Sequence, residues 1–394
     1  MVGDRPASTE RLRRQNAALV LRSLRRLGPA TRAELAQRTG LAKATVGVIV
    51  AGLEAAGAVT EEESRSGARG RPGRPVALSG ERWVGVGLEL NVDYVAAVVV
   101  DLAGGVVHHE VRPVEGGRTG HERALLGLAE AVRDRCRAAG QVSVGATVAV
   151  PALVRGDNRT VAWAPNLALE GPDLADRVAD LLGTPVRVGN DANCAAYAEA
   201  RHGAAAGVRH ALYLTGTVGI GAGIVDRGEL VRGGAGFAGE VGHMPVGDPT
   251  ARCGCGRVGC WEASVGLHAM LAAVGMPELA TPLETAAAVA QRAATDAEVR
   301  AALGRVGEAV GLGLAMLAGV LDPEVVVLGG YFVPLGDLVL EPARRTLDAR
   351  LASAAQVRPE LRLSTLGIEA AALGAAEQAF ADVLAGDVDL TAGT

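Results

Sequence analysis

The first eighty residues place apolar positions at helical spacing among basic ones. From 11 to 27, leucine, alanine and valine recur every three or four residues between arginines, and the pattern ends at Gly28. Thr31 starts a second helix, because Glu34 completes a capping box, and Gly40 turns the chain into a third. The apolar positions of the second and third helices, which we expect to face inward, are Leu35, Ala36, Leu41, Val46, Ile49 and Leu53.

A basic loop between two short strand-like stretches follows these helices. Residues 58–63 and 76–78 favour strands, and the connection between them is rich in arginine, glycine and proline. Helices followed by such a hairpin predict a winged helix-turn-helix, whose third helix enters the major groove of DNA while the basic loop contacts the minor groove. A plain helical hairpin followed by a solvated linker is the alternative. The predicted DNA contacts are Arg32, Lys43, Ala44, Thr45, Arg69, Arg71 and Arg74.

From Trp83 the pattern changes to alternating strands and helices. Crossover helices and glycine turns at the strand ends predict an α/β fold with clefts at its switch points. We expect a loop at 162–167 and a mainly helical remainder beyond the cysteine-rich region. The expected strands are 83–89, 94–101, 106–111, 142–150, 185–188, 211–215, 222–225, 325–328 and 361–363, and the expected helices before that region are 119–139, 173–182 and 189–202.

Length and charge divide the chain. At 394 residues, two or three domains are expected. Residues 1–80 hold fourteen Lys or Arg against seven Asp or Glu, a charge of +7, and the total of −5 therefore leaves −12 for residues 81–394. A basic head predicts a polyanion partner for that part alone. The chain has no run of about eighteen apolar residues and no signal-peptide core, so we expect a cytoplasmic protein without membrane contacts.

Three cysteines and a histidine have the spacing of a closed metal site. Cys253, Cys255 and Cys260 form a C-x-C-x4-C pattern among glycines, and His243 lies ten residues upstream. Three thiolates and an imidazole suit a tetrahedral zinc ion with no open position, so we predict structural zinc at these four residues. Buried reduced cysteines or a disulfide pair are the alternatives, although the odd total of five cysteines opposes a disulfide framework.

Two carboxylates, Glu240 and Glu262, bracket the metal motif, and a bound ion would fix them as acceptors for the hydroxyls of a polyol. The combined pattern, E-x-G-H and then C-x-C-G-x-x-G-C-x-E, resembles the signature of the ROK family of repressors, open reading frames and sugar kinases. The resemblance covers nearly the whole chain. It implies a winged helix-turn-helix head over 1–80 and a two-lobed actin-like sugar-kinase body. The lobes would span 81–190 and 191–394, with the last helix packed back on the first lobe.

The resemblance also implies a sugar site. Asp191 matches the aspartate that serves as general base in the family's kinases, although an aspartate at the start of a helix is more often an N-cap. His243 would give one ring nitrogen to zinc and the other to the sugar. The implied sugar contacts are Asn166, Asn190, Asp191, Glu240, His243 and Glu262.

The phosphate motifs of the family's kinases are altered in this chain. The D-x-G-G-T motif is replaced by Glu89-Leu90-Asn91-Val92-Asp93, and G-T-G-x-G by Thr217-Val218-Gly219-Ile220-Gly221. The first motif loses both glycines and gains a carboxylate, which disfavours the phosphates of ATP. We therefore predict no catalytic residues and no enzyme.

The function that these patterns favour is that of a sugar-responsive regulator. The head would bind operator DNA, and a sugar or sugar derivative in the kinase-like cleft would release it from carbohydrate genes. Two heads in a homodimer or homotetramer would change their separation when the lobes close. The alternatives are an active ATP-dependent sugar kinase with an appended DNA-binding head, and a constitutive DNA-binding protein with an inert body.

Overall fold

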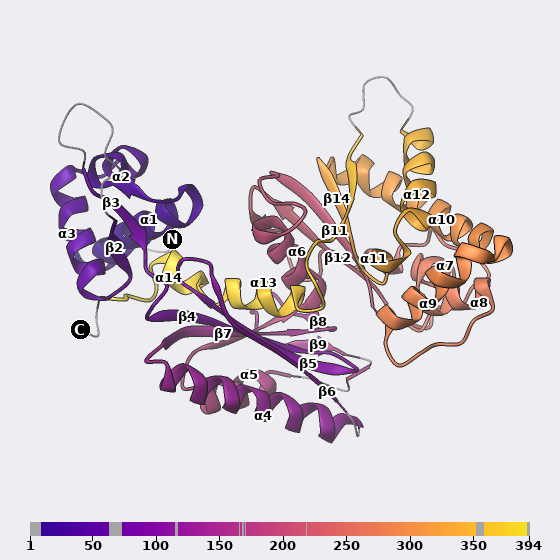
Figure 1. Cartoon of the computed structure of the whole chain (residues 1–394), viewed down its shortest axis with the longest axis horizontal. Helices are drawn as coiled ribbons and strands as arrows, with labels where there is room; N and C mark the ends of the chain where they lie inside the picture. The colour runs from indigo at the N-terminus through magenta and orange to yellow at the C-terminus, as the bar shows by residue number, and fades with distance from the viewer. Residues whose placement is uncertain are drawn as a thin grey trace, which may run out of the picture.

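The chain forms a small N-terminal head and two lobes, each centred on a sheet, with the C-terminal helices running between them (Figure 1). The head lies beside the first lobe and away from the second (Figure 1). The structure is a computed structural model, and it describes residues 9–62, 73–114, 117–164, 166–167, 169, 171–217, 219–351 and 358–391.

The head is a winged helix-turn-helix, which confirms the prediction. Thr31 caps α2 through both bonds of a capping box with Glu34, and Gly40 ends that helix with a φ of +73° in the left-handed region. A sheet of order β1-β3-β2 closes the head, in which β2 and β3 pair antiparallel. The elements are α1 (Thr9–Leu27), β1 (Ala30–Thr31), α2 (Arg32–Thr39), α3 (Lys43–Ala55), β2 (Val59–Glu61) and β3 (Pro75–Leu78).

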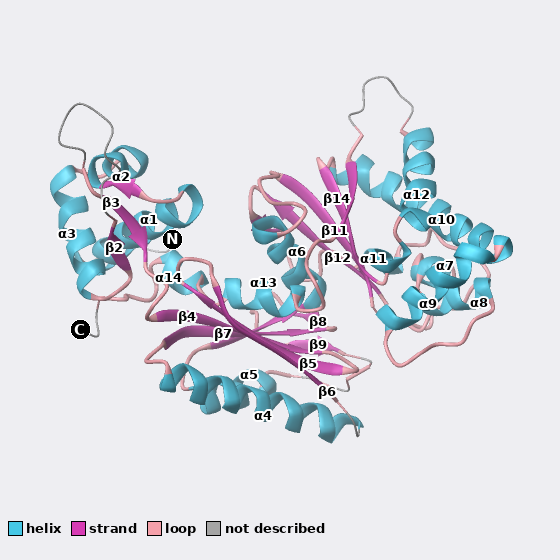
Figure 2. Cartoon of the chain, in the orientation of Figure 1, coloured by secondary structure: helices cyan, strands magenta, loops and turns pink. Residues whose placement is uncertain are grey.

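The first lobe is built on a sheet of order β10-β7-β4-β5-β6. Strands β4, β5 and β6 form an antiparallel meander, whereas β7 and β10 run parallel to β4. Helices α4 and α5 cover one face (Figure 2). The loop expected at 162–167 is wrong at its start, because β9 pairs with β8 in a short hairpin. The elements are β4 (Trp83–Leu90), β5 (Tyr94–Asp101), β6 (Val106–Pro113), α4 (Gly117–Ala138), β7 (Val142–Val150), β8 (Leu153–Val154), β9 (Val161–Trp163), α5 (Asp173–Leu182) and β10 (Val186–Asn190).

The second lobe has a sheet of order β13-β12-β11-β14-β15. Alternation along β11 sends Leu212 and Leu214 toward the large core and Tyr213 toward α6 on the opposite face. The elements are α6 (Asp191–His202), β11 (His210–Gly216), β12 (Ile220–Asp226), β13 (Glu229–Leu230), η1 (Val241–His243), α7 (Glu262–Val265), α8 (Leu267–Val274), α9 (Pro282–Thr295), α10 (Ala297–Leu321), β14 (Val325–Gly330), α11 (Phe332–Leu335), α12 (Asp337–Arg350) and β15 (Glu360–Leu363).

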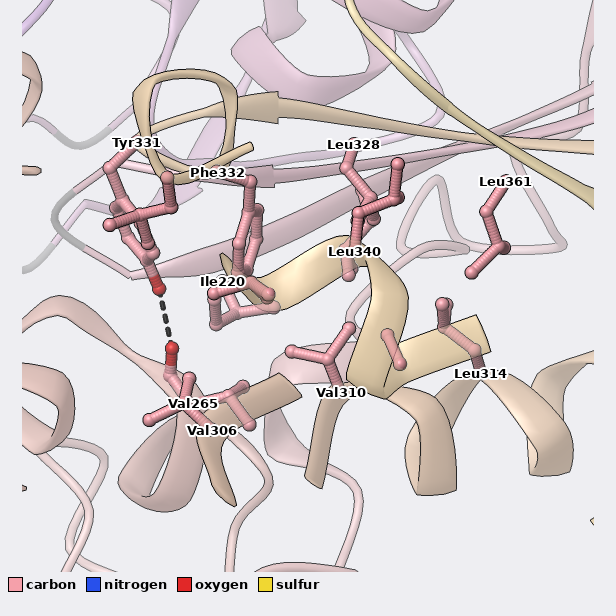
Figure 3. Packing of buried hydrophobic residues seen from close by; sticks show 14 of the residues in the cluster. Ile220, Val265, Val306, Val310, Leu314, Leu328, Tyr331, Phe332, Leu340 and Leu361 are labelled. Carbon is pink, nitrogen blue, oxygen red and sulfur yellow. Dashed lines mark hydrogen bonds between the residues drawn. The ribbon is translucent and has the colours of Figure 1, made fainter. Parts of the chain in front are cut away.

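The large core of the second lobe packs α10 and α12 against the sheet (Figure 3). Val310 and Leu314 of α10 face Leu328 and Leu340, and the hydroxyl of Tyr331 donates to the carbonyl of Val265 at 2.6 Å. Among the described helices, α10 alone is long and apolar enough by composition to span a membrane, yet more than half of its most apolar window is buried inside the protein. Most of its apolar side chains therefore belong to the core of this lobe.

The C-terminal helices join all three parts of the molecule. Helix α13 (Ala370–Gln378) lies between the first-lobe sheet and α6, and α14 (Ala381–Ala385) packs on α1 of the head. The approach of α13 is close because it meets glycines. A Cβ at Gly87 would collide with the carbonyl of Ala372, and one at Gly374 would collide with the carbonyl of Cys194. Substitution at either glycine would therefore push α13 away from its neighbours.

Candidate functional site

The three cysteines and the histidine meet at one point beside the second-lobe sheet. One ligand atom from each of His243, Cys253, Cys255 and Cys260 lies within 4.8 Å of all the others. The sulfurs of Cys255 and Cys260 are 3.7 Å apart, and Nδ1 of His243 is 3.8 Å from the sulfur of Cys253. Zinc–sulfur bonds of about 2.3 Å in a tetrahedron place two sulfurs about 3.8 Å apart. The four residues therefore fit a tetrahedral metal ion.

The metal cluster also positions carboxylate and imidazole groups next to it. Since Nδ1 of His243 faces the cysteines, its Nε2 is left for another partner. Oε1 of Glu262 lies 3.5 Å from the sulfur of Cys253, and its Oε2 accepts the amide hydrogen of Ile220 at 2.8 Å. Glu262 is thus held between the metal cluster and the turn that joins β11 to β12.

Asp191 and Glu262 lie close enough to Glu240 for their charges to affect its carboxyl group. Burial, together with the charges of Asp191 and Glu262, raises the pKa of Glu240 to about 7. Burial likewise raises the pKa of Asp191 to about 6. Clustered carboxylates are costly in an empty site, but they are strong acceptors for a ligand that brings several hydroxyl donors. The arrangement is suited to binding a polyol.

The two asparagines among the predicted sugar contacts, Asn190 and Asn166, do not lie with the carboxylates in the cavity wall. Asn190, and not Asp191, caps α6, since its Oδ1 accepts from the amide of Asn193 at 3.0 Å while its Nδ2 donates to Ala152 at 3.2 Å. The cap leaves Asp191 as the first helical residue and lining a cavity. Asn166 is exposed in a turn and does not line that cavity. Sugar contacts from these residues stay predictions.

The cavity lies where the altered phosphate motif ends β4. Its volume is about 210 Å³, and its wall includes Glu89, Asn91 and Tyr94. Oε1 of Glu89 accepts hydrogen bonds from Tyr94 at 2.6 Å and from Asn91 at 3.1 Å. Burial raises the pKa of Glu89 to about 7, although Tyr94, Asn91 and the amide of Ala372 lower it. A hydrogen-bonded carboxyl group thus stands in the stretch that matches the kinases' phosphate motif.

Glu89→Gln is expected to flatten the dependence of stability on pH. Between about pH 4.5 and 7 the folded protein keeps a proton on Glu89 that the unfolded chain has lost, so stability falls as pH rises through this window. The loss amounts to about 3 kcal/mol above pH 8. Chemical denaturation of both proteins from pH 4 to 9 measures the slope. The exposed control Glu81→Gln should keep the wild-type slope, and an unchanged slope in Glu89→Gln would contradict the assignment.

The exposed start of α3 carries the predicted DNA contacts of the head. Lys43 and Ala44 are exposed, Thr45 is half-buried, and Val48 one turn later is 72% exposed. Sequence reasoning missed Val48, which the i, i+4 spacing from Ala44 places on the same face. An exposed apolar side chain on such a helix suits contact with a thymine methyl group.

The arginines around α3 differ in their freedom to reach DNA. Arg32 forms an ion pair with Glu61 at 2.5 Å and lies 4.0 Å from Glu54. Arg74 is 71% exposed and 3.9 Å from the same Glu61. The remaining predicted contacts, Arg69 and Arg71, lie outside the described residues. Contact between Arg32 and a phosphate would therefore compete with Glu61.

A buried charge network that the sequence did not reveal joins the head to both lobes. Arg25 of α1 donates to both carboxylate oxygens of Glu377 at 3.0 and 2.9 Å, and their side chains are only 7% and 2% exposed. His202 of α6 lies 3.0 Å from the same carboxylate, and Arg201 lies 3.8 Å away. Arg25 also stacks over the ring of Phe380 at 4.3 Å. The network spans 352 residues of sequence.

Known protein families and proteins match both the head and the body of this chain. The ROK family model matches residues 85–381, and a MarR family model matches residues 12–70. The xylose repressor of Caldicellulosiruptor bescii is 30% identical over 390 residues, covering 95% of this chain and 97% of the repressor. The glucokinase of Streptomyces coelicolor is also 30% identical, but the match covers 75% of this chain and 96% of the enzyme.

A solved structure agrees over the full length. The crystal structure of a ROK family transcriptional regulator, described as a homologue of the Escherichia coli Mlc protein, superposes with a TM-score of 0.79 at 23% identity, covering 95% of this chain and 98% of that one. The fold is therefore the two-lobed ROK body behind a winged helix-turn-helix head. From the family match, the near full-length relative and this architecture, the chain belongs to the ROK family and carries a MarR-like DNA-binding head.

Proposed function

We propose that this protein is a sugar-responsive transcriptional repressor. The proposal rests on how much of this chain each relative matches. A protein named as a xylose repressor matches across head and body, whereas one named as a glucokinase matches over a length that corresponds to the body alone. A chain that keeps a DNA-binding head fused to a polyol site has the two sites that induction requires.

The cleft supports a binding role in preference to phosphoryl transfer. Kinases of this type need glycine turns and a charge environment that accepts phosphate. Here Glu89 is buried at the end of β4, and Asp93 and Asp191 line the same cavity. Each carboxylate opposes a nearby triphosphate by several kcal/mol at about 4–5 Å and an effective dielectric near 20. We accordingly assign no catalytic residue, and Asp191 serves as an acceptor for a sugar hydroxyl.

The proposal divides the chain into three working parts. The head spans 1–80, and the lobes span 81–190 and 191–394, with α13 returned to the first lobe. Zinc on His243, Cys253, Cys255 and Cys260 is structural, and when bound it holds His243 and Glu262 in place for the sugar. A homodimer or homotetramer brings two heads to one operator.

Helix α6 is the element that couples sugar to DNA in this proposal. Its first residue, Asp191, lies at the polyol site, and its last, His202, contacts Glu377. Glu377 in turn binds Arg25 of the head. A sugar that draws Asp191 toward Glu240 would tilt α6 as a rigid rod and shift the buried carboxylate beneath α1. The orientation of the head would then depend on whether the site is filled.

Operator release tests the proposed function. DNA that binds the full chain is selected from a random pool, and its affinity is measured by fluorescence anisotropy with and without xylose, glucose or N-acetylglucosamine. At least one sugar should change the affinity by about tenfold, equivalent to about 1.4 kcal/mol of coupling. Sugar-dependent ATP consumption at about 1 s⁻¹ or more, the low end for kinases, would instead support the enzyme.

Lys43→Ala is expected to weaken DNA binding without changing sugar affinity. Lys43 is exposed at the first turn of α3, and losing one phosphate contact should reduce the slope of log affinity against log salt by about 1. Anisotropy titrations at four salt concentrations measure that slope. Arg209→Ala removes one exposed positive charge from the second lobe and should leave it unchanged. Equal slopes for Lys43→Ala and wild type would show that Lys43 does not meet the DNA backbone.

A further inference from the structure

The 210 Å³ cavity adjoins the polyol site but has a different chemical character. Asp191 belongs to both, because it lines the cavity and its charge raises the pKa of Glu240. The turn between β11 and β12 forms the partition. Thr215 near the end of β11 and Thr217 in the turn line the cavity, and the amide of Ile220 at the start of β12 donates to Glu262. A ligand held at Asp191 can therefore extend past this turn into the cavity.

The charges on the cavity wall reject phosphate groups. Glu89, Asp93 and Asp191 all line it, and the described lining contains no lysine, arginine or histidine. Burial raises the pKa of Asp93 as well, with the nearby charge of Glu278 adding to the effect. A nucleotide would bring several negative charges among carboxylates without one compensating cation. The cavity is thus suited to an uncharged occupant.

The remaining lining is largely apolar and fits one ring. Pro282, Leu283, Val333, Leu366 and Ile368 come from three separate segments that close over the cavity together with Tyr331. An apolar cavity of about 150 Å³ is known to accommodate benzene, so about 210 Å³ holds an aromatic ring with a small substituent. These five apolar side chains offer a sugar ring no hydrogen-bond partner.

One buried carboxylate oxygen in the wall has no hydrogen bond of normal length. Glu89 is 2% exposed, and although its Oε1 accepts from Asn91 and Tyr94, its Oε2 makes no hydrogen bond of normal length among the described residues. A buried acceptor of this kind is unfavourable until a donor reaches it. A hydroxyl or amine on the ring of the occupant would supply that donor.

We propose that the cavity receives the uncharged, hydroxyl-bearing aromatic substituent of a glycoside whose sugar ring lies among Asp191, Glu240 and Glu262. This inference rests on the proposed function and names its effector class, an aryl glycoside in place of a free monosaccharide. The aromatic ring contacts Val333 and Leu366, and its hydroxyl donates to Glu89. The same molecule thereby spans the polyol site and the cavity, and it touches residues of both lobes.

Isothermal titration of the full, metal-loaded chain tests this inference. Methyl, phenyl, 4-hydroxyphenyl and 4-carboxyphenyl glycosides of xylose and glucose are compared in both anomers. The 4-hydroxyphenyl glycoside of one sugar should bind at least tenfold more tightly than its methyl glycoside, and the 4-carboxyphenyl glycoside should lose that gain. Equal affinity of methyl and aryl glycosides would overturn the inference. Tighter binding by a disaccharide, or submillimolar binding of magnesium with a non-hydrolysable ATP analogue, would overturn it too.

Variants test whether the higher affinity for aryl glycosides than for methyl glycosides arises in the cavity. Val333→Phe fills it and should remove the preference for aryl glycosides while leaving methyl glycosides bound, and Ile368→Trp does the same from a position that is 37% exposed. Val320→Phe, the same exchange at an 82% exposed position on α10, should keep the preference. Glu89→Leu should remove the advantage of 4-hydroxyphenyl over phenyl. A gain that persists in both cavity-filling variants would overturn the inference.

The titration and the operator-release experiment together show whether the inference fails alone or together with the proposed function. If free sugars release operator DNA but aryl glycosides bind no better than methyl glycosides, the effector class is wrong and the repressor stands. If no sugar or glycoside binds and operator affinity never changes, both are wrong.

Discussion

Replacing Glu377 by glutamine is expected to lower the free energy of unfolding by about 3–5 kcal/mol, because it leaves the guanidinium of Arg25 buried without its counterion. Arg25 is 7% exposed and gives both of its close bonds to this carboxylate. Chemical denaturation of the full chain measures the change. Glu360→Gln breaks an exposed pair with Arg362 and should cost less than about 1 kcal/mol. Similar costs for the two variants would mean that the buried pair is not a structural link.

The stability difference between wild type and Glu377→Gln should depend on pH. Burial acts to raise the pKa of Glu377, but the hydrogen bond from His202 and the charges of Arg25 and Arg201 outweigh it and hold the pKa below its ordinary value. The stabilisation is therefore present above the unfolded pKa of about 4.3 and is lost as pH falls through the lower folded pKa. The gap between wild type and Glu377→Gln should shrink below about pH 4.

Glu377→Gln also separates coupling from binding. The network lies away from the described polyol residues and from the exposed face of α3, so the variant should still bind sugar and operator DNA at a temperature where it is folded. What it should lose is the effect of sugar on DNA affinity, because α6 no longer acts on α1 through a shared carboxylate. Wild-type release by the variant would place the coupling elsewhere, for example in a change of subunit arrangement alone.

Removing the metal is expected to abolish sugar binding and to spare DNA binding. Cys255→Ser should weaken metal affinity by more than about 100-fold, since even neighbours of metal ligands contribute about 10–100-fold. Without the ion, three cysteines and His243 no longer hold the loop that positions Glu262. Metal content per chain, measured by atomic emission, and sugar affinity should fall together, and the thermal transition of the second lobe should move down.

A matched cysteine exchange controls for this prediction. Cys136 is buried in the first lobe, outside the metal cluster, and Cys136→Ser should keep both the metal and the sugar affinity. Operator affinity of Cys255→Ser in the absence of sugar should equal that of wild type, because the hydrophobic core that the head shares with the first lobe and the C-terminal helices does not include the metal cluster. Loss of DNA binding in Cys255→Ser would show that the metal supports the whole molecule and not the sugar site alone.

The features that sequence predicted well are those carried by short, regular patterns. The capping box at Thr31, the glycine turn at Gly40 and the cysteine spacing each act within a dozen residues, and the structure has all three. Asp191 was correctly placed at the start of α6, but the cap belongs to Asn190, because either residue type can accept from the amide three positions on. Local chemistry alone does not choose between adjacent capping residues.

Contacts between segments that are distant in sequence could not be predicted from short patterns. The partners Arg25 and Glu377 are 352 residues apart, and an arginine on a basic amphipathic helix gives no sign that it will be buried. Loss of glycines near Glu89 indicated a changed phosphate motif, yet only the structure shows the hydrogen bonds from Asn91 and Tyr94 and the orphan oxygen beside them. The first contact depends on how the head packs on α13, and the second on side-chain conformations where β4 meets β5; periodicity encodes neither.

The position of α13 also sets an order of events during synthesis. The head and the first-lobe strands leave the ribosome early, but the helix that lies between them and α6 is among the last segments made. At about 5–20 residues per second, α1 waits roughly 20–70 s for its partner. Until then the glycine-lined face of β4 and the charge of Arg25 are uncovered, and the core of the head lacks the apolar side chains that the C-terminal helices add to it, so the DNA-reading module is completed only when synthesis ends.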